Sequence, residues 1–168
     1  MPLRFSAIVA ALVLMFAGNA YAQDSADVMI EQPHDMHALG AIAAKRDLPV
    51  LLMFSADGCP YCERVEEDFL KPMLISGDYT NKVLIRMVKV DDAGDVTDFD
   101  GRRISMDDFA RRYQVRVTPT VVFLDAHGHQ LAQRLIGIST PDFYGGDLDN
   151  AIDHSLALLH GHTRVSGL

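Results

Sequence analysis

A continuous apolar run, Val50 to Ala56, leads within three residues to Cys59, the first of the only two cysteines in the chain. A run of this length and composition predicts a β-strand that is covered on both faces. From Pro60 onward the apolar residues recur at helical spacing, and a proline in the first turn of a helix costs no hydrogen bond. The sequence therefore predicts that Cys59 and Cys62 lie where a buried strand ends and a helix begins.

Helical and strand patterns alternate along the rest of the chain. This order predicts an α/β domain with a parallel unit and a closing antiparallel hairpin. Pro72 is expected to kink or end the helix that starts at the cysteines. The other predicted elements are a helix from Asp35 that stops before Pro49, a strand over 82–90, a helix over 104–115 with Ser105 as N-cap, two strands over 120–125 and 130–138, and a terminal amphipathic helix after Gly145 and Gly146.

The first 22 residues have the pattern of a secretory signal peptide. "MPLR" supplies a basic start, "FSAIVAALVLMFAG" is an apolar stretch of suitable length, and "AYA" is a small-x-small cleavage site. The apolar stretch is shorter than the roughly 20 residues of a membrane span, and no cysteine follows it to carry a lipid anchor. We expect cleavage after Ala22, which leaves a flexible, polar arm over 23–34 and one domain over 35–168.

Composition restricts what this domain can do. Removal of the signal peptide leaves 146 residues, enough for one domain with a substantial core. These residues include 14 basic and 23 acidic side chains, a formal net charge of −9, which argues against binding of nucleic acid. Two cysteines are too few for a disulfide-stapled scaffold, and a bridge between Cys59 and Cys62 closes a loop too short to stabilise the fold much.

The predicted position of the cysteines favours redox chemistry. Unpaired amides and the macrodipole at a helix N-terminus favour the thiolate of Cys59. Cys62 lies about one turn further on, so its sulfur can reach Cys59 and form a disulfide. Cys59 is therefore the predicted attacking sulfur and Cys62 the resolving one. Apolar neighbours (Met53, Phe54, Pro60, Tyr61) are expected to surround the pair, and acidic neighbours (Asp57, Glu63, Glu66, Glu67) oppose strong stabilisation of the thiolate.

Three stretches, "VLLMFSADGCPYC", "MVKVD" and "YQVRVTPTVVFLDAHGHQLAQRLIG", follow one another in the order found in thioredoxin-like proteins. The chain resembles the thioredoxin superfamily over most of the predicted domain, which implies a thioredoxin-like fold with a central mixed four-stranded sheet flanked by helices. Within that superfamily, "VTDFDG" followed by "FARRYQVRVTPTVVF" resembles the periplasmic SoxW type of thioredoxin-related protein, here with a CPYC motif. The resemblance thus implies a periplasmic location.

The resemblance also implies roles for individual residues. Cys59 matches the nucleophile and Cys62 the resolving thiol. Pro119 matches the cis-proline that faces them, and the backbone of Thr118 is expected to pair with a substrate strand. Lys89 matches the lysine beneath the active site. The predicted substrate-binding residues are Pro60, Tyr61, Thr118 and Pro119.

The sequence departs from thioredoxin at two positions near the motif. Gly58 stands where thioredoxin has a tryptophan, and Met53 stands where it has a buried acid. Proton transfer at Cys62 therefore lacks its usual group, and water or a nearby glutamate has to replace it. The longer segment 91–103 is expected to border the site as a solvated loop, and it lacks the terminal bidentate glutamate of an EF-hand calcium loop.

These observations predict an enzyme, a periplasmic thiol–disulfide oxidoreductase that reduces protein or small-molecule disulfides without a bound cofactor. The resemblance implies a membrane electron donor of the DsbD type. A disulfide oxidase or isomerase is the alternative, because the Pro-Tyr dipeptide also occurs in glutaredoxin-like and isomerase-like relatives. A copper-handling module is less favoured. A tetrahedral zinc site would need two histidines besides the thiolates, and the sequence places no histidine near Cys59. His127 and His129 fall in a predicted hairpin turn, His160 and His162 lie near the end of the chain, and His34 and His37 lie in the predicted arm and first helix.

Overall fold

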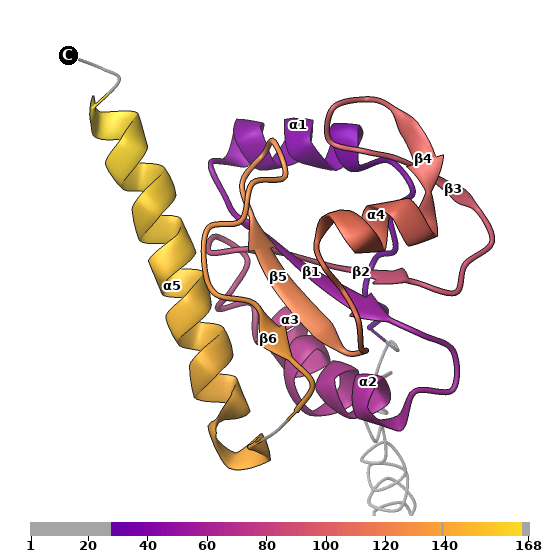
Figure 1. Cartoon of the computed structure of the whole chain (residues 1–168). Helices are drawn as coiled ribbons and strands as arrows, with labels where there is room; N and C mark the ends of the chain where they lie inside the picture. Colours follow the sequence, from indigo (N-terminus) through magenta and orange to yellow (C-terminus); the bar gives the residue numbers. More distant parts are fainter. Residues whose placement is uncertain (1–27, 139, 166–168) are drawn as a thin grey trace, which may run out of the picture.

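The computed structural model describes residues 28–138 and 140–165 (Figure 1). Its central sheet has four strands in the order β2-β1-β5-β6. Strand β1 pairs parallel with β2 and antiparallel with β5, and β5 pairs antiparallel with β6. This is the mixed sheet that the sequence predicts, and every residue of β1 is buried in it. The strands are β1 (Val50–Ser55), β2 (Leu84–Lys89), β5 (Thr120–Leu124) and β6 (Leu135–Ile136).

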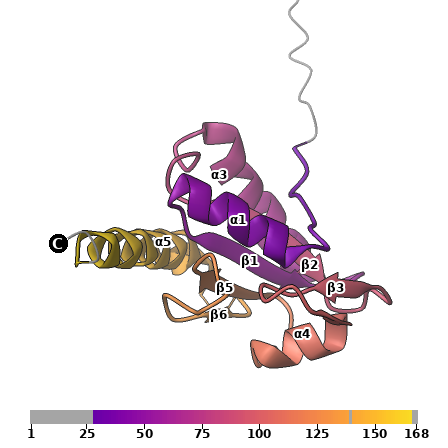
Figure 2. The same ribbon diagram turned by 90° about the horizontal axis from the view of Figure 1, so that it is seen from above.

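Helices cover both faces of this sheet, and Figure 2 shows α3 and α4 on opposite sides of it. Successive residues of a strand point to opposite faces, so β1 contributes to two separate hydrophobic clusters. The first cluster packs against α1 (Met36–Arg46) and α4 (Met106–Arg112). The second packs against α5 (Pro141–Val165) and the continuous helical run of α2 (Pro60–Val65), η1 (Glu66–Leu70) and α3 (Lys71–Ser76).

Within the described part of the chain, every helix is too short or too polar to serve as a membrane span.

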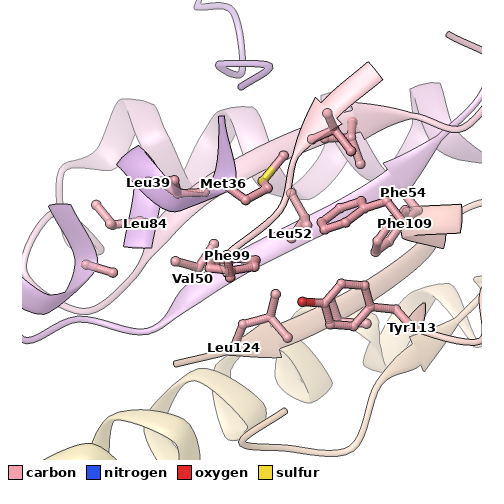
Figure 3. Packing of buried hydrophobic residues seen from close by; sticks show 14 of the residues in the cluster. Met36, Leu39, Val50, Leu52, Phe54, Leu84, Phe99, Phe109, Tyr113 and Leu124 are labelled. Atoms are coloured by element: carbon pink, nitrogen blue, oxygen red, sulfur yellow. The ribbon is translucent and has the colours of Figure 1, made fainter. Parts of the chain in front are cut away.

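Three aromatic rings hold α4 against β1 (Figure 3). The ring of Phe54 lies 5.8 Å from that of Phe109 and 5.7 Å from that of Tyr113, measured between centroids. Phe109 and Tyr113 meet edge-on at 5.2 Å. Aromatic pairs at such distances contribute about 0.5–1.5 kcal/mol beyond the burial of their area. This packing fixes the end of α4, from which the chain continues to Thr118 and the start of β5.

Residues 28–34 lie along β2, which differs from the loose arm that the sequence predicts there. Ile30 is 3% exposed and belongs to the second cluster. The backbone N–H of Met87 donates to the carbonyl of Glu31 at 3.1 Å. The segment therefore covers part of a sheet edge that would otherwise present unpaired backbone groups. The rest of the predicted arm and the predicted signal peptide, residues 1–27, lie outside the described part of the chain.

Pro72 does not end the helix that begins at Pro60. Directly before it, a π-helical turn brings the N–H of Lys71 to the carbonyl of Glu66. Proline has no N–H to donate, and a local change to the wider π turn accommodates the missing bond. The helical run therefore continues through α3 to Ser76.

The segment after β2 is more ordered than the solvated loop that the sequence predicts. Strands β3 (Asp95–Thr97) and β4 (Arg103–Ser105) form a small antiparallel sheet. Val96 is fully buried and Phe99 is 6% exposed, and both belong to the first cluster. The segment is exposed at 91–95 and at 100–103, and its buried residues lie between these two stretches. These two apolar side chains thus anchor the segment in the core of the domain.

A buried carboxylate joins the same segment to α4. Asp98 is fully buried, and its Oδ1 accepts the N–H of Phe99 at 2.6 Å. Its Oδ2 forms an ion pair with Arg112 of α4, although the alignment of the two groups does not meet hydrogen-bond geometry. At the other end of α4, the hydroxyl of Ser105 accepts the N–H of Asp108 at 3.1 Å, so the predicted N-cap is confirmed.

Two boundaries near the C-terminus differ from the prediction. Strand β6 has only two residues, because the chain before it leaves the ladder with β5 after an isolated bridge at Gln130. Helix α5 starts at Pro141, before the glycine pair 145–146 that the sequence suggests as a breaker. Glycine costs a helix about 1 kcal/mol relative to alanine, and burial of Tyr144 and Leu148 on either side of the pair offsets that cost.

Candidate active site: the Cys59–Cys62 disulfide

Cys59 is the N-cap of α2, at the end of the short loop that leaves β1. Its backbone is extended, and its Sγ accepts the N–H of Cys62 at 3.2 Å. Its carbonyl accepts the N–H groups of Cys62 and Glu63 at 3.0 and 3.1 Å. Pro60 follows at the first helical position, where an N–H has no intrahelical partner in any case. The sulfur of Cys59 is therefore held against the helix amides that stabilise negative charge.

The two cysteines form a disulfide, with an Sγ–Sγ distance of 2.15 Å and a Cα–Cα distance of 5.2 Å. Their environments differ. Cys59 is half-buried, whereas Cys62 is only 2% exposed beneath the start of α2. An incoming sulfur atom can therefore reach Cys59 but not Cys62.

The loop before β5 lies against the exposed sulfur. The hydroxyl of Thr118 is 3.6 Å from the Sγ of Cys59. The bond between Thr118 and Pro119 is cis, the isomer that the resemblance implies. The carbonyl of Pro119 accepts the N–H of Gly137 at 2.8 Å, which ties the loop to the end of β6. The fold thus brings Thr118 and Pro119 to the disulfide, as expected from the sequence.

Exposed apolar side chains lie beside these residues. Tyr61, between the cysteines, is 61% exposed, and Val117, directly before Thr118, is 52% exposed. Ile136 is 58% exposed on β6, where it pairs with Thr120 at the start of β5. The sequence predicts Tyr61 as a contact residue but does not single out Val117 or Ile136. Only the register of β6 places Ile136 at this end of the sheet.

Lys89 forms an ion pair next to the disulfide. Its Nζ lies 2.5 Å from Oδ1 of Asp57, two residues before Cys59. The N–H of Asp57 donates to Oδ2 of Asp91 at 2.9 Å. The hydrogen bond to Asp57 raises the pKa of Lys89, and the charges of Asp57, Asp91 and Glu66 add to that effect. The charge of Asp57, which the sequence suggests as unfavourable to a thiolate, is therefore offset by a lysine.

Comparison with known proteins assigns the family. The family model described as a thioredoxin-like domain matches residues 37–150. The chain belongs to this thioredoxin-like family. A thioredoxin-like domain with a CxxC pair at disulfide distance indicates a thiol–disulfide oxidoreductase. A search of curated protein sequences gives no significant match.

Solved thioredoxin structures are similar in fold. A mutant of a poplar thioredoxin h is 18% identical with a TM-score of 0.51, over 75% of this chain and 88% of that one. The thioredoxin of Fasciola hepatica is 17% identical with a TM-score of 0.50, over 75% of this chain and 99% of that one. The thioredoxin of Malassezia sympodialis is 20% identical with a TM-score of 0.50, over 76% and 95% of the two chains. At these identities the similarity concerns the fold.

The structure shows the surroundings of Met53 and Gly58, the two positions at which the sequence departs from thioredoxin. Met53 is fully buried in the second cluster, and β1, with the sequence VLLMFS, contributes no ionisable side chain to the site. Gly58 has a φ of +63°, a conformation that glycine adopts without the cost a larger residue incurs. The loop into Cys59 thus turns at a residue with no side chain, and the strand that leads to the loop offers no carboxylate.

The histidines predicted in the hairpin turn lie there. The rings of His127 and His129 are 6.1 Å apart, and Nδ1 of His129 lies 3.0 Å from Oδ2 of Asp125. Among the residues that the structure describes, no three His, Cys, Asp or Glu side chains are grouped so that they could hold a metal ion.

Proposed function

We propose that this protein is a periplasmic thiol–disulfide reductase that acts on disulfides of proteins or small molecules. The observation that carries the proposal is the difference between its two sulfurs. In a thioredoxin-like domain, Cys59 is half-buried and caps a helix, and Cys62 is 2% exposed behind it. This difference suits a pair in which one sulfur meets the substrate and the other completes the exchange.

The proposed cycle begins with the reduced pair. The thiolate of Cys59 attacks one sulfur of the substrate disulfide, and the other substrate sulfur leaves with the electron pair of the broken bond and takes up a proton. Cys62 then loses its proton and attacks Cys59, so that the second substrate sulfur leaves and is protonated. The substrate gains two electrons and two protons, and the protein is left with the Cys59–Cys62 disulfide.

The surroundings of Cys59 support an extended peptide as one class of substrate. We propose that the backbone of Thr118 pairs with such a peptide and that Pro60, Tyr61 and Pro119 contact it. The exposed side chains of Tyr61 and Val117 offer apolar surface beside the reacting sulfur. Apolar contacts around a few fixed polar groups are typical of binding sites that accept several ligands.

The location and the electron donor are part of the same proposal. The signal-peptide pattern of residues 1–22 and the resemblance to the SoxW type support a periplasmic protein that is cleaved after Ala22 and whose domain includes the packed residues 28–34. The periplasm is kept oxidising, so a reductase there needs a source of electrons. We propose a membrane donor of the DsbD type. Mass spectrometry of the exported protein is expected to find Gln23 as the first residue, and retention of residues 1–22 would contradict this part of the proposal.

Cysteine variants test the exchange site. Cys62→Ser is expected to retain the first attack but to be unable to release its partner, so mixed disulfides with periplasmic proteins accumulate. Cys59→Ser is expected to trap little, because Cys62 is buried. Partners are captured from a periplasmic extract, released with reductant and identified. Equal trapping by both variants, or by neither, would contradict the proposed roles.

The reduction potential tests the direction of electron flow. A reductase is expected to have a potential nearer the about −270 mV of thioredoxin than the about −120 mV of a strong oxidant. Equilibration with glutathione buffers of known ratio, followed by thiol alkylation, gives the value. A potential at the oxidising end would favour a disulfide oxidase or isomerase. Stoichiometric copper bound by Cys59 and Cys62 without reductase activity would favour a copper-handling module.

A further inference from the structure

The second step of the proposed cycle needs a proton acceptor for Cys62. The thiol of Cys62 has to lose its proton before it attacks the mixed disulfide, because the thiolate is the nucleophile. Cys62 is 2% exposed, so bulk water has little access to it. Strand β1, which leads to the cysteine pair, has the sequence VLLMFS and carries no ionisable side chain that could take the proton. The acceptor therefore has to come from a neighbouring element.

Glu66 is the acidic residue that α2 places on the side of Cys62. The N–H of Glu66 donates to the carbonyl of Cys62, so the two residues are one helical turn apart. Side chains at this spacing lie on the same face, with Cβ atoms about 5–6 Å apart. The side chain of Glu66 is only 22% exposed, whereas that of the adjacent Glu67 is 60% exposed and Glu63 lies on the exposed side of the helix. Glu66 alone of these three carboxylates is directed inward.

The carboxylate of Glu66 forms an ion pair with one lysine and lies within electrostatic reach of a second. Nζ of Lys71, from the same helical run, lies 3.5 Å from its Oε1. Lys89, at the end of β2, faces it closely enough that the charge of Glu66 adds to the raised pKa of that lysine. Lys89 is in turn bound to Asp57, and Asp91 lies behind Asp57. Within this charged group, Glu66 follows Cys62 most closely along the continuous helical run of α2, η1 and α3.

We propose that Glu66 is the proton acceptor for Cys62, in place of the buried acid that this chain lacks at Met53. This inference rests on the proposed reductase cycle. As Cys62 attacks, its S–H bond breaks and the proton passes to a carboxylate oxygen of Glu66, directly or through one water molecule. The Cys62–Cys59 bond forms, the bond from Cys59 to the substrate breaks, and the electron pair leaves on the substrate sulfur, which is protonated from solvent. Glu66 returns its proton to solvent, and the reverse sequence accompanies reduction of the disulfide.

The test compares Glu66→Gln with Glu63→Gln. Both variants remove one negative charge from the same helix within four residues of Cys62, so they differ in position and not in net charge. Reduced protein, exported and processed by a bacterial host, is mixed with glutathione disulfide and quenched with acid. Mass spectrometry then follows the mixed disulfide on Cys59 over time, which separates the attack step from the resolving step.

Glu66→Gln is expected to leave attack by Cys59 within about 2-fold of the unaltered protein and to slow resolution by at least about 10-fold, whereas a full general-base contribution is about 100-fold or more. Added acetate or imidazole is expected to recover part of the lost rate, and Glu66→Asp, which retains a carboxylate, is expected to be intermediate. Glu63→Gln is expected to behave like the unaltered protein. Far-ultraviolet circular dichroism checks that each variant is folded.

Three results would overturn the inference. Resolution in Glu66→Gln equal to that in Glu63→Gln would mean that another group takes the proton. A loss that neither added base nor Glu66→Asp recovers would mean that Glu66 supports the helix and does not transfer a proton. If the unaltered protein forms neither a mixed disulfide nor the Cys59–Cys62 disulfide with glutathione disulfide, the proposed function fails and the inference fails with it, so the two failures are distinguishable.

Discussion

Replacement of Asp98 tests how the segment between β2 and α4 is held to the domain. Asp98→Ala removes a fully buried carboxylate that accepts the N–H of Phe99 and pairs with Arg112. Loss of the hydrogen bond from Phe99 is expected to cost more stability than loss of the ion pair with Arg112. Phe99 is 6% exposed, so its N–H finds little water in the variant. Arg112 is 38% exposed and keeps Asp100 at 3.6 Å, so its charge remains solvated and partly paired.

The exposure of Phe99 and of Arg112 determines how far Asp98→Ala is expected to lower the free energy of unfolding. A buried donor left without an acceptor costs about 1–3 kcal/mol. Loss of an ion pair by an arginine that stays partly exposed costs about 0–1 kcal/mol. We therefore expect Asp98→Ala to lower the free energy of unfolding by about 2–3 kcal/mol. Asp98→Asn keeps an oxygen that can accept the N–H of Phe99, so we expect a loss of about 1 kcal/mol. Asp100→Asn removes an exposed carboxylate and serves as the control, with a change within about 0.5 kcal/mol.

The measurement is urea unfolding followed by circular dichroism, because the chain has no tryptophan to report by fluorescence. Midpoints compared at a common slope give the differences in free energy. The reduction potential of the disulfide is expected to stay unchanged, since none of the contacts of Cys59 involves Asp98. Equal losses for Asp98→Ala and Asp98→Asn, or losses below about 0.5 kcal/mol for both, would refute the argument that the buried N–H dominates.

Three further predictions concern other parts of the fold. Gly128→Ala is expected to destabilise the protein more than Gly137→Ala. Both glycines have a positive φ, a backbone conformation that costs other residues about 1–2 kcal/mol. Only at Gly128 would an added Cβ also clash with an aromatic ring, that of Phe99 at 2.6 Å. Equal losses on urea unfolding would exclude this steric cause. Gly146→Ala is expected to raise the stability by up to about 1 kcal/mol, since the residue lies within α5 and an added Cβ meets nothing within 4 Å; a lowered urea midpoint would contradict this. Asp149→Ala is expected to lower the pKa of Tyr79 from about 12, because it removes the hydrogen bond to Asp149, which is the main cause of the raised value. Titration of the tyrosinate absorbance measures the change. The stability that this bond adds is present below pH 10 and is lost as the pH rises through about 12.

The sequence alone predicts the features that depend on neighbours along the chain. The apolar run of β1, the proline after Cys59 and the helical spacing beyond it are local patterns, so they place the cysteine pair at the start of a helix without any knowledge of tertiary contacts. The cap at Ser105 is local in the same sense, because the hydroxyl and its partner N–H lie three residues apart.

Other local patterns are overridden by packing. The glycine pair 145–146 suggests a helix breaker, yet α5 runs through it because buried side chains on either side hold the helix. The acidic composition of residues 91–100 suggests a solvated loop, yet Val96 and Phe99 enter the core and carry the segment with them. The intrinsic preference of one residue for a helix or a loop contributes little free energy, whereas burial of a large apolar side chain contributes about 1.5–3 kcal/mol.

The contacts that give the site its chemistry depend on tertiary structure. Lys89 meets Asp57 because β1 and β2 are parallel neighbours in a fixed register, and Thr118 meets Cys59 because β5 lies on the other side of β1. Nothing in the chain near either cysteine indicates these partners. The sequence determined which two sulfurs form the disulfide, since that follows from spacing along one helix. The fold decided which of them a substrate can reach and which charges surround them, since burial and pairing depend on residues that are distant along the chain.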